Sequence, residues 1–395
     1  MNILYLCHRI PYPPDKGDKI RSFHQIEQLA REHTVHLACL IDDPNDLQHV
    51  KTLEKYCASV DAVYQGRGAA RLRALAALFT GAPLSVAAFA SRALRKKIQA
   101  RMRSETFDRI IMFSSAMAQY INPGSGIPAV MDFVDLDSEK WRLYADVHPF
   151  PMSWVYRLEA RRLARYEEQV ARIFDHAIFV SEKEAELFRS RVTDQPVSVI
   201  PNGVDTDYYD PVLLAREDSG PPTLVFVGAM DYFPNVDAVQ YFCERIFPLI
   251  RVEIPTAILY IVGRNPARPV RKLGRHPNVI VTGAVPDVRP YLAQAHLAVA
   301  PFRVARGIQN KVLEAMAMGV PVVGTSMAFQ GMPVNPLNGI WICDDPDGFG
   351  EQVVRLLMDA QLRNRCSVAA RSYVERYHRW LDHGTRLDML LQRIG

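Results

Sequence analysis

The segment PFRVARGIQNKVLEAMAMGVPVV, residues 301–323, carries the most informative pattern in the chain. An apolar run, Leu297–Ala300, ends just before it, and a basic loop leads into a helical pattern that opens near residues 307–310. Gly319 follows the helical pattern, as is typical of a helix end, and the next apolar run begins at Val320. A strand, a helix and a second strand in this order predict a parallel α/β sheet.

The same segment carries the residue types of a phosphate site. Gly307 lets a ligand approach the backbone closely, and free N–H groups at a helix start suit a phosphate. Arg303, Arg306 and Lys311 add positive charge. Lys311 and Glu314 share a helix face, and Glu314 lies about two turns, or roughly 10 Å, beyond Gly307. This predicts phosphates at the helix start and a sugar diol on Glu314; the alternative is a solvated Lys–Glu pair on an ordinary connecting helix.

Short apolar runs alternate with helical patterns along the whole chain, in two series. We expect strands of the first series at Ile3–Cys7, Val35–Ile41, Ala62–Tyr64, Arg109–Phe113, Ala129–Phe133, Ala177–Val180 and Val197–Ile200. We expect strands of the second series at Thr223–Val227, Thr256–Val262, Val279–Thr282, Leu297–Ala300, Val320–Gly324 and Gly339–Ile342.

The polar, Pro- and Gly-containing stretch Asp210–Pro222 separates the two series and is the best linker candidate. The expected fold is two doubly wound α/β domains that face each other across a cleft. We place the first domain at residues 1–205, the linker at 206–222 and the second domain at 223–365. A helical pattern covers Glu351–Ile394, and we expect its last part, residues 366–395, to form a C-terminal helix.

The composition is that of an ordinary globular protein. The chain has 395 residues, 49% of them apolar and 23% charged, which excludes disordered, collagen-like and disulfide-scaffold chains. A net charge of +4 is too small to indicate a nucleic-acid partner. The six cysteines form no CxxC pair, and the N-terminus lacks the pattern of a signal peptide, so we expect reduced thiols and a cytoplasmic protein.

One uncharged stretch, Ala74–Ser91, is 18 residues long and approaches the length of a membrane span. Gly81-Ala82-Pro83 interrupts it in the middle, and proline breaks a helix interior. We therefore expect two short helices joined by a turn.

Several segments, in the expected order, resemble the GT-B glycosyltransferases of family 4. They are Val199–Asp205, Phe226–Gly228, Gly283–Val288 and Leu313–Val323, with Phe179–Glu182 as the preceding helix start. Three other segments, Pro13–His24, Asp132–Trp141 and Arg306–Lys311, resemble most closely the sugar transferases of bacterial PEP-CTERM/exosortase systems. The resemblance implies a retaining transferase that uses a nucleotide sugar, without metal or cofactor, in exopolysaccharide biosynthesis. It also implies that the C-terminal helix, residues 366–395, returns to the first domain, with Trp380 at the crossing.

The resemblance also implies residue roles, with departures from the family pattern. Glu314 matches the glutamate that binds the nucleotide ribose, whereas Arg306 stands where the family has a first glutamate. Ala229 and Pro234 stand where the family has the arginine and lysine that hold the diphosphate, so we expect other cations to replace them. The expected donor-binding residues are Gly17, Arg264, Val285, Arg306, Gly307, Ile308, Lys311 and Glu314, and the base, uracil or guanine, is expected near Gly283–Pro286.

The segment Asp132–Asp137 follows an apolar strand at the expected cleft edge. The resemblance places the reacting sugar nearby, so Asp135 or Asp137 could orient or deprotonate the acceptor hydroxyl. Asp135-Leu136-Asp137 also matches a DxD metal motif, although we expect no metal. The alternative is that Asp137 or Ser138 caps the next helix.

Two stretches, Arg67–Arg109 and Trp154–Arg172, are basic and partly apolar, and they give information on the type of acceptor. Amphipathic basic helices can lie on anionic lipid, which would fit a lipid-linked acceptor and peripheral attachment to the inner face of the cell membrane. A solvated helix face is the alternative. The expected partners are a UDP- or GDP-sugar, a glycan or lipid-linked acceptor, an anionic membrane surface and no nucleic acid.

Two other functions compete with the transferase. A non-catalytic GT-B-like scaffold of a polysaccharide synthesis system would explain why the usual glutamate and the arginine–lysine pair are absent. A dinucleotide-dependent dehydrogenase would need G-x-G-x-x-G after a first strand, which neither series has.

Overall fold

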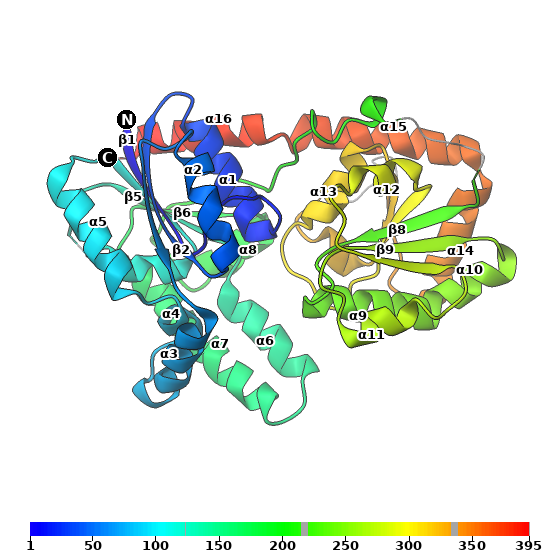
Figure 1. The fold of residues 1–395 in the computed structure, drawn as a ribbon, viewed down its shortest axis with the longest axis horizontal. Coiled ribbons are helices and arrows are strands. Elements are labelled where there is room, and N and C mark those ends of the chain that lie inside the picture. The colour runs from blue at the N-terminus through cyan, green and yellow to red at the C-terminus, as the bar shows by residue number, and fades with distance from the viewer. Residues whose placement is uncertain (123, 215–219, 333–338, 395) are drawn as a thin grey trace. The chain divides into compact units, whose positions relative to one another are not determined.

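The computed structural model describes residues 1–122, 124–214, 220–332 and 339–394. The chain forms two compact units (Figure 1). Unit 1 comprises Met1–Pro201 and Trp380–Gly395, and unit 2 comprises Asn202–Arg379. Each unit contains one parallel sheet, and each is described by itself below.

The sheet of unit 1 has seven parallel strands in the order β3-β2-β1-β4-β5-β6-β7. Because both faces are covered, its central strands are nearly continuous apolar runs. In β1 alternate side chains enter opposite layers: Tyr5 packs with one buried cluster and Leu4 and Leu6 with the other. The strands are β1 Asn2–Cys7, β2 Thr34–Ile41, β3 Ser59–Tyr64, β4 Arg109–Phe113, β5 Ala129–Val134, β6 His176–Phe179 and β7 Val197–Val199.

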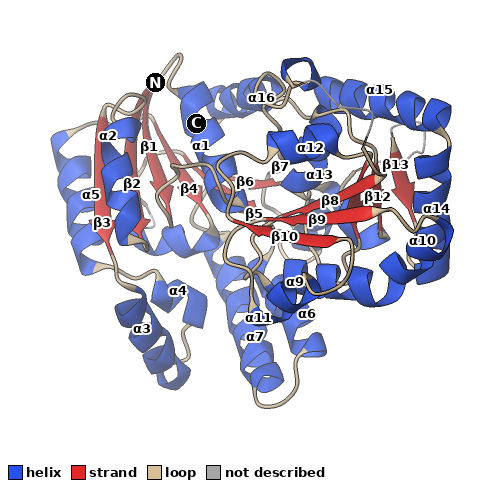
Figure 2. Ribbon diagram, turned by 45° about the vertical axis from the view of Figure 1, so that its right-hand side comes forward, coloured by secondary structure: helices blue, strands red, loops and turns tan. Residues whose placement is uncertain are grey.

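Helices cover both faces of this sheet (Figure 2). Apolar side chains of α1, α2 and α16 join Tyr5 in one layer, and those of α5, α7 and α8 join Leu4 in the other. The helices of unit 1 are α1 Gly17–Leu29, α2 Val50–Leu53, α3 Arg67–Thr80, α4 Leu84–Ala88, α5 Arg92–Ser104, α6 Asp137–Val147, α7 Met152–Val170, α8 Glu182–Arg189 and α16 Trp380–Arg393, with 3₁₀ helices at Pro44–His49 and Ser115–Tyr120.

The contact between α1 and α16 requires a glycine. A Cβ atom on Gly384 would lie 2.6 Å from Cβ of Gln28, so any larger residue would push the two helices apart. At the start of α16 the indole of Trp380 stacks on the ring of His24, with centroids 5.0 Å apart. The last helix is thereby fixed against the first helix of unit 1.

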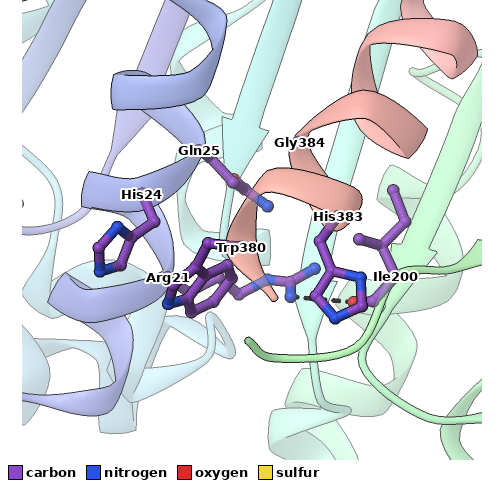
Figure 3. Close-up of a pocket in the computed structure, with 7 residues that line it drawn as sticks. All are labelled: Arg21, His24, Gln25, Ile200, Trp380, His383 and Gly384. Carbon is purple, nitrogen blue, oxygen red and sulfur yellow. Dashed lines mark hydrogen bonds between the residues drawn. The ribbon is translucent and has the colours of Figure 1, made fainter. Parts of the chain in front are cut away.

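A buried ion pair joins α1 to the sheet. Arg21 and Asp132 are both fully buried, and Arg21 Nε donates to Asp132 Oδ2 at 2.8 Å. Gln25 Nε2 donates to the same oxygen at 2.7 Å, and Arg21 Nη1 donates to the carbonyl of Ile200 at 2.9 Å. Figure 3 shows Arg21 extending from α1 toward Ile200, beside Trp380 and His383 in a small pocket. The pair therefore ties α1, β5 and the end of β7 together.

The sheet of unit 2 has six parallel strands in the order β10-β9-β8-β11-β12-β13. The strands are β8 Thr223–Val227, β9 Ile258–Val262, β10 Val279–Gly283, β11 Leu297–Ala300, β12 Val322–Gly324 and β13 Ile340–Ile342. The helices are α9 Phe233–Tyr241, α10 Phe247–Glu253, α11 Arg268–Leu273, α12 Arg289–Gln294, α13 Asn310–Ala317, α14 Pro346–Met358 and α15 Ala360–Tyr377, with 3₁₀ helices at Pro211–Leu213 and Ser326–Phe329 and a π-helical turn at Phe242–Ile246.

The two doubly wound sheets confirm the expected fold class, and the strand bounds differ from the expected ones by a few residues at most. Ala74–Ser91 forms the end of α3, a turn at Gly81 with φ +80°, and α4, as expected. Within the described ranges no helix combines the length and apolarity that a bilayer crossing requires. The helical pattern over Glu351–Ile394 is divided into three helices. The predicted domain boundaries stay predictions, and the predicted linker includes residues 215–219, outside the described ones.

Candidate donor site and acceptor-side carboxylates

The first candidate site lies where the strand order of unit 2 reverses, at the carboxyl ends of β8 and β11. In a doubly wound sheet the chain leaves these two strands toward opposite faces, which opens a crevice for a ligand. Gly228 follows β8, and the loop of residues 301–309 follows β11 and leads into α13. The segment of residues 301–323 therefore begins at this edge of the sheet.

Two glycines allow the backbone to pack closely there. A Cβ atom on Gly263 would lie 1.6 Å from the carbonyl oxygen of Gly228. A Cβ atom on Gly228 would lie 2.7 Å from Asn235 Nδ2 and 3.2 Å from Lys311 Nζ. Only glycine at position 228 lets these two polar side chains reach the end of β8.

Lys311 is held in place by three neighbours. Its Nζ donates to Asn235 Oδ1 at 2.5 Å, and Asn235 Nδ2 donates to the carbonyl of Ala229 at 2.8 Å. The ammonium group lies 4.8 Å from the ring centre of Phe302 and 5.4 Å from that of Phe226. Burial lowers the pKa of Lys311 to about 8, against the opposing charge of Glu314. Because the ammonium group of Lys311 is removed from water, a hydrogen bond from it to an anion would be strong.

Glu314 lies on the same helix, near Lys311. Burial raises the pKa of Glu314 to about 7, and the charge of Lys311 opposes that rise. Burial and then the charge of Glu314 raise the pKa of Tyr209 well above its usual value, so this phenol also lies near. Because α13 begins only at Asn310, Glu314 is about one helical turn, ~6 Å, beyond the helix start. The helix start falls within the expected range 307–310, and the separation of about 10 Å expected between Gly307 and Glu314 stays a prediction.

The loop before α13 folds on itself. Gly307 has φ +63°, and Gln309 Nε2 donates to the carbonyls of Arg306 at 2.9 Å and Gly307 at 3.3 Å. Arg306 is partly exposed, whereas Ile308 belongs to the buried core of unit 2. The guanidinium group of Arg303 forms a surface ion pair with Asp237, in which Nη2 lies 2.5 Å from Oδ1.

The other predicted donor residues follow neighbouring strands or lie in unit 1. Arg264 follows β9, and its carbonyl accepts from the backbone N–H of Met230 at 2.9 Å, which joins the loops after β8 and β9. Val285 follows β10 and packs against the core of unit 2. Gly17 is the first residue of α1 in unit 1 and is exposed. Within unit 2 the structure therefore brings helix α13, which carries Lys311 and Glu314, to the end of β8, where the loop that carries Arg264 is also bonded.

The two candidate acceptor-side carboxylates lie at the carboxyl end of β5. Asp135 follows Val134, whose φ of +66° is strained for a β-branched residue and turns the chain sharply there. Asp137 is the first residue of α6 and forms an ion pair with Lys140. No group of three or more His, Cys, Asp and Glu able to hold a metal ion occurs in the described parts of the chain. That the reaction needs no metal stays a prediction.

The alternative that Asp137 or Ser138 caps α6 is wrong. The N-cap residue is Leu136, and the first turn is capped from outside: the backbone N–H groups of Leu136 and Ser138 donate to Glu184 at 3.0 Å and to Glu167 at 3.1 Å. Burial raises the pKa of Glu167 to about 8, although its hydrogen bonds with Ser138 act in the opposite direction. The first turn of α6 is thus capped by side chains of α8 and α7. It therefore does not need the carboxylate of Asp137 as a cap.

The structure adds Asn235 and Arg9 to the residues that the sequence singled out. Asn235, which accepts from Lys311 Nζ, lies at the start of α9, seven positions after Gly228. An asparagine so close to the glycine at the end of β8 was the sequence signal that could have indicated this role. In unit 1, His8 and Arg9 follow β1, and both contact Asp18 at 3.2 Å and 2.7 Å. Burial acts to raise the pKa of Asp18, but the hydrogen bonds and charges of His8 and Arg9 hold it well below its usual value.

Two family models match successive parts of the chain. Residues 22–208 match the model of Glycosyltransferase Family 4, and residues 221–359 match that of Glycosyl transferases group 1. One subunit of the human phosphatidylinositol N-acetylglucosaminyltransferase is 31% identical over 180 residues, which cover 43% of this chain and 35% of that protein. The match thus spans about a third of this relative's length.

Solved structures match nearly the whole chain. Sucrose-phosphate synthase from Thermosynechococcus elongatus gives a TM-score of 0.71 at 17% identity, with 99% of this chain and 98% of that one covered. Anabaena Alr3699/HepE, solved in complex with UDP and glucose, gives 0.65 at 15% identity and covers 99% of both chains. WaaG, a glycosyltransferase involved in lipopolysaccharide biosynthesis, gives 0.64 at 17% identity and covers 99% of this chain and 100% of its own. These likenesses show the GT-B fold.

Proposed function

We propose that this chain, which carries a family 4 and a group 1 glycosyltransferase domain, moves a sugar from a UDP- or GDP-sugar to a glycan or lipid-linked acceptor. The observation that carries the proposal is the position of Lys311 Nζ, held by Asn235 against Gly228 at the end of β8. The crevice of a doubly wound sheet at this edge is where such folds hold nucleotides. HepE, a structural neighbour, was solved with UDP, which supports the same class of donor.

In the proposed donor site, other cations replace the arginine and lysine that the family pattern has at positions 229 and 234. Lys311 meets the diphosphate, with Arg264 and Arg306 from the neighbouring loops, and takes the place of the residues absent at Ala229 and Pro234. Glu314 accepts from the ribose hydroxyls. Gly307, Ile308 and Val285 shape the backbone around the nucleotide, and Gly17 of unit 1 stays a predicted contact of the phosphates.

We propose a retaining reaction that needs no metal and no cofactor. The acceptor oxygen forms its bond to the anomeric carbon on the face from which the diphosphate leaves, and the bond from that carbon to the phosphate oxygen breaks. The acceptor proton passes to the leaving phosphate oxygen. Lys311, placed in advance and partly desolvated, stabilises the charge that develops on the diphosphate. The configuration of the product at the anomeric carbon, read by NMR, tests retention.

The proposed setting is exopolysaccharide biosynthesis on the cytoplasmic side of the membrane. Its support is the resemblance of Pro13–His24, Asp132–Trp141 and Arg306–Lys311 to PEP-CTERM/exosortase-associated sugar transferases. The human relative belongs, by its name, to an N-acetylglucosaminyltransferase of phosphatidylinositol, which supports a lipid-linked acceptor.

A panel of nucleotide sugars tests the function. We expect one UDP- or GDP-sugar to raise the melting temperature of the full chain, and the same sugar to yield free UDP or GDP when lipid-linked or glycan acceptors are added. Stabilisation without turnover on any acceptor would favour the non-catalytic scaffold. A panel in which no nucleotide sugar binds would overturn the proposal.

Asp135→Asn is expected to lower the turnover number by about 100-fold, because a misplaced acceptor costs roughly that much. The affinity for the nucleotide sugar should stay unchanged, since Asp135 lies in unit 1 and the proposed donor residues lie mainly in unit 2. The measurement is kcat beside a calorimetric Kd. Asp146→Asn, an exposed position on α6, is the control. Full turnover in Asp135→Asn would remove its proposed role.

Donor affinity is expected to be highest between about pH 7 and pH 8. Above the Lys311 pKa of about 8 the amine becomes neutral and attracts the diphosphate less. Below the Glu314 pKa of about 7 the carboxyl becomes protonated and loses acceptor capacity for the ribose hydroxyls. Calorimetry with the UDP- or GDP-sugar selected by the panel checks both limbs. Lys311→Met should abolish the alkaline decline alone and Glu314→Gln the acid decline alone; declines that persist in both variants would contradict these assignments.

A further inference from the structure

The helix α3 turns an apolar face toward solvent. Leu72, Leu75 and Phe79 fall on one side of the helix and are 70%, 58% and 91% exposed. The side that faces the protein carries Ala77, which is buried. Helices of globular proteins ordinarily point their apolar stripe inward, so this arrangement is the reverse of the usual one.

The turn between α6 and α7 adds a second exposed apolar group. Phe150 is 81% exposed and Trp154 57%, and Val147 and Met152 are exposed beside them in the sequence. In both views this turn and α3 project from the same side of unit 1 (Figures 1 and 2). We call these residues together, Leu72, Leu75, Phe79, Val147, Phe150, Met152 and Trp154, the apolar rim.

The apolar rim is built on a fixed support. Arg162 of α7 donates to the carbonyls of Ala77 at 2.9 Å and Leu78 at 3.1 Å, which satisfies the last turn of α3. Glu159 of α7, itself almost fully buried, accepts from the backbone N–H groups of Leu84 at 2.6 Å and Ser85 at 2.9 Å. Since α7 ties down both α3 and α4, the exposed face of α3 is not a frayed end.

The charge around the apolar rim is positive. The helices α3 and α7 expose arginines. In contrast, two carboxylates of α7, Glu159 and Glu167, are buried and cap the starts of other helices. On the described residues of α3, α6 and α7, the exposed acids are Asp146 on α6 and Glu168 near the C-terminal end of α7. The exposed arginines are Arg67 and Arg71 on α3 and Arg157, Arg161 and Arg165 on α7, and Arg67 lies 3.8 Å from Asp43.

We propose that the apolar rim docks unit 1 on an anionic lipid bilayer. Exposed Phe, Leu and Trp side chains enter the boundary between headgroups and acyl chains, where aromatic rings are favoured. Arginines beside them attract anionic headgroups, at about 1 kcal/mol for each charge near the surface. An apolar patch edged by cations matches an anionic bilayer better than an acidic protein surface, because such a surface would leave the largely exposed Phe79 and Phe150 without an apolar partner.

Vesicle flotation of the full chain tests the inference. We expect binding to vesicles of phosphatidylcholine mixed with phosphatidylglycerol, much weaker binding to phosphatidylcholine alone, and release by salt. Leu72→Ser combined with Phe79→Ser should weaken binding by about tenfold or more, since each loses the transfer of a large apolar side chain. Arg67→Gln combined with Arg71→Gln should reduce the dependence on phosphatidylglycerol.

The matched control is Val252→Ser combined with Val368→Ser, two positions of unit 2 that are 75% and 69% exposed. Its vesicle binding should equal that of the unaltered chain. Equal loss in the control and in the α3 variant, or no flotation with anionic vesicles, would overturn the inference, and so would self-association through the apolar rim without vesicle binding. No nucleotide sugar is present in the assay, so its result is independent of the proposed transferase activity.

Discussion

Replacing Lys311 with methionine is expected to weaken nucleotide-sugar binding by about 10- to 100-fold. A hydrogen bond to a charged group contributes roughly 1.5–3 kcal/mol, which corresponds to that range. Methionine fills the space between Phe226 and Phe302, so the fold should persist. Glu314→Gln should weaken binding by a smaller factor, because the amide keeps one acceptor oxygen for the ribose. Calorimetry with UDP and with the selected nucleotide sugar provides the measurement.

Lys272→Met is the control for this prediction. Lys272 is an exposed lysine on α11 of the same unit, and its replacement should leave the affinity unchanged. Circular dichroism melting curves separate loss of binding from loss of folding. If Lys311→Met and Glu314→Gln both bind as the unaltered chain does, the proposed donor site is not the nucleotide site.

Asp132→Ala is expected to lower the free energy of unfolding of unit 1 by about 3–5 kcal/mol, the usual cost of removing one partner of a buried ion pair. Arg21 would keep its bond to the Ile200 carbonyl but would hold an uncompensated charge in a fully buried place. Gln25 Nε2 and the backbone N–H of Val134 would lose their acceptor as well. Urea unfolding followed by tryptophan fluorescence measures the effect.

Fluorescence is well suited to this variant, since three of the four tryptophans, Trp141, Trp154 and Trp380, belong to unit 1. Asp194→Ala, at an exposed loop position, is the control and should change little. The double substitution Arg21→Met with Asp132→Leu should recover part of the loss, because it removes both charges together. A loss in Asp132→Ala no greater than that in Asp194→Ala would show that the pair does not stabilise unit 1.

The strands of the fold follow from local sequence. Thr223–Val227 and Leu297–Ala300 lie where the apolar runs predicted them, because a buried parallel strand is apolar along its whole length. The division of the C-terminal helical pattern could also have been read locally: Asp359 caps α15 by accepting from the backbone N–H of Leu362 at 2.8 Å. The apolar periodicity continues through this point and concealed the break.

The sites depend more on contacts between distant positions. Lys311 and Glu314 could be paired from their spacing on one helix. The partner of Lys311, Asn235, is 76 positions away, and the approach to it depends on a glycine at position 228. Likewise, Arg21 meets Asp132 across 111 positions. The carboxylates that cap α6 come from α7 and α8, so no local pattern around Asp137 could reveal them.

Crystals of the full chain soaked with UDP, and separately with GDP, would show whether the nucleotide binds beside Lys311 and Glu314. We predict density for one nucleotide at the carboxyl ends of β8 and β11, with a diphosphate oxygen within hydrogen-bond distance of Lys311 Nζ and the ribose hydroxyls on Glu314. A nucleotide bound elsewhere on unit 2, or one in this crevice with its diphosphate turned away from Lys311, would contradict this prediction.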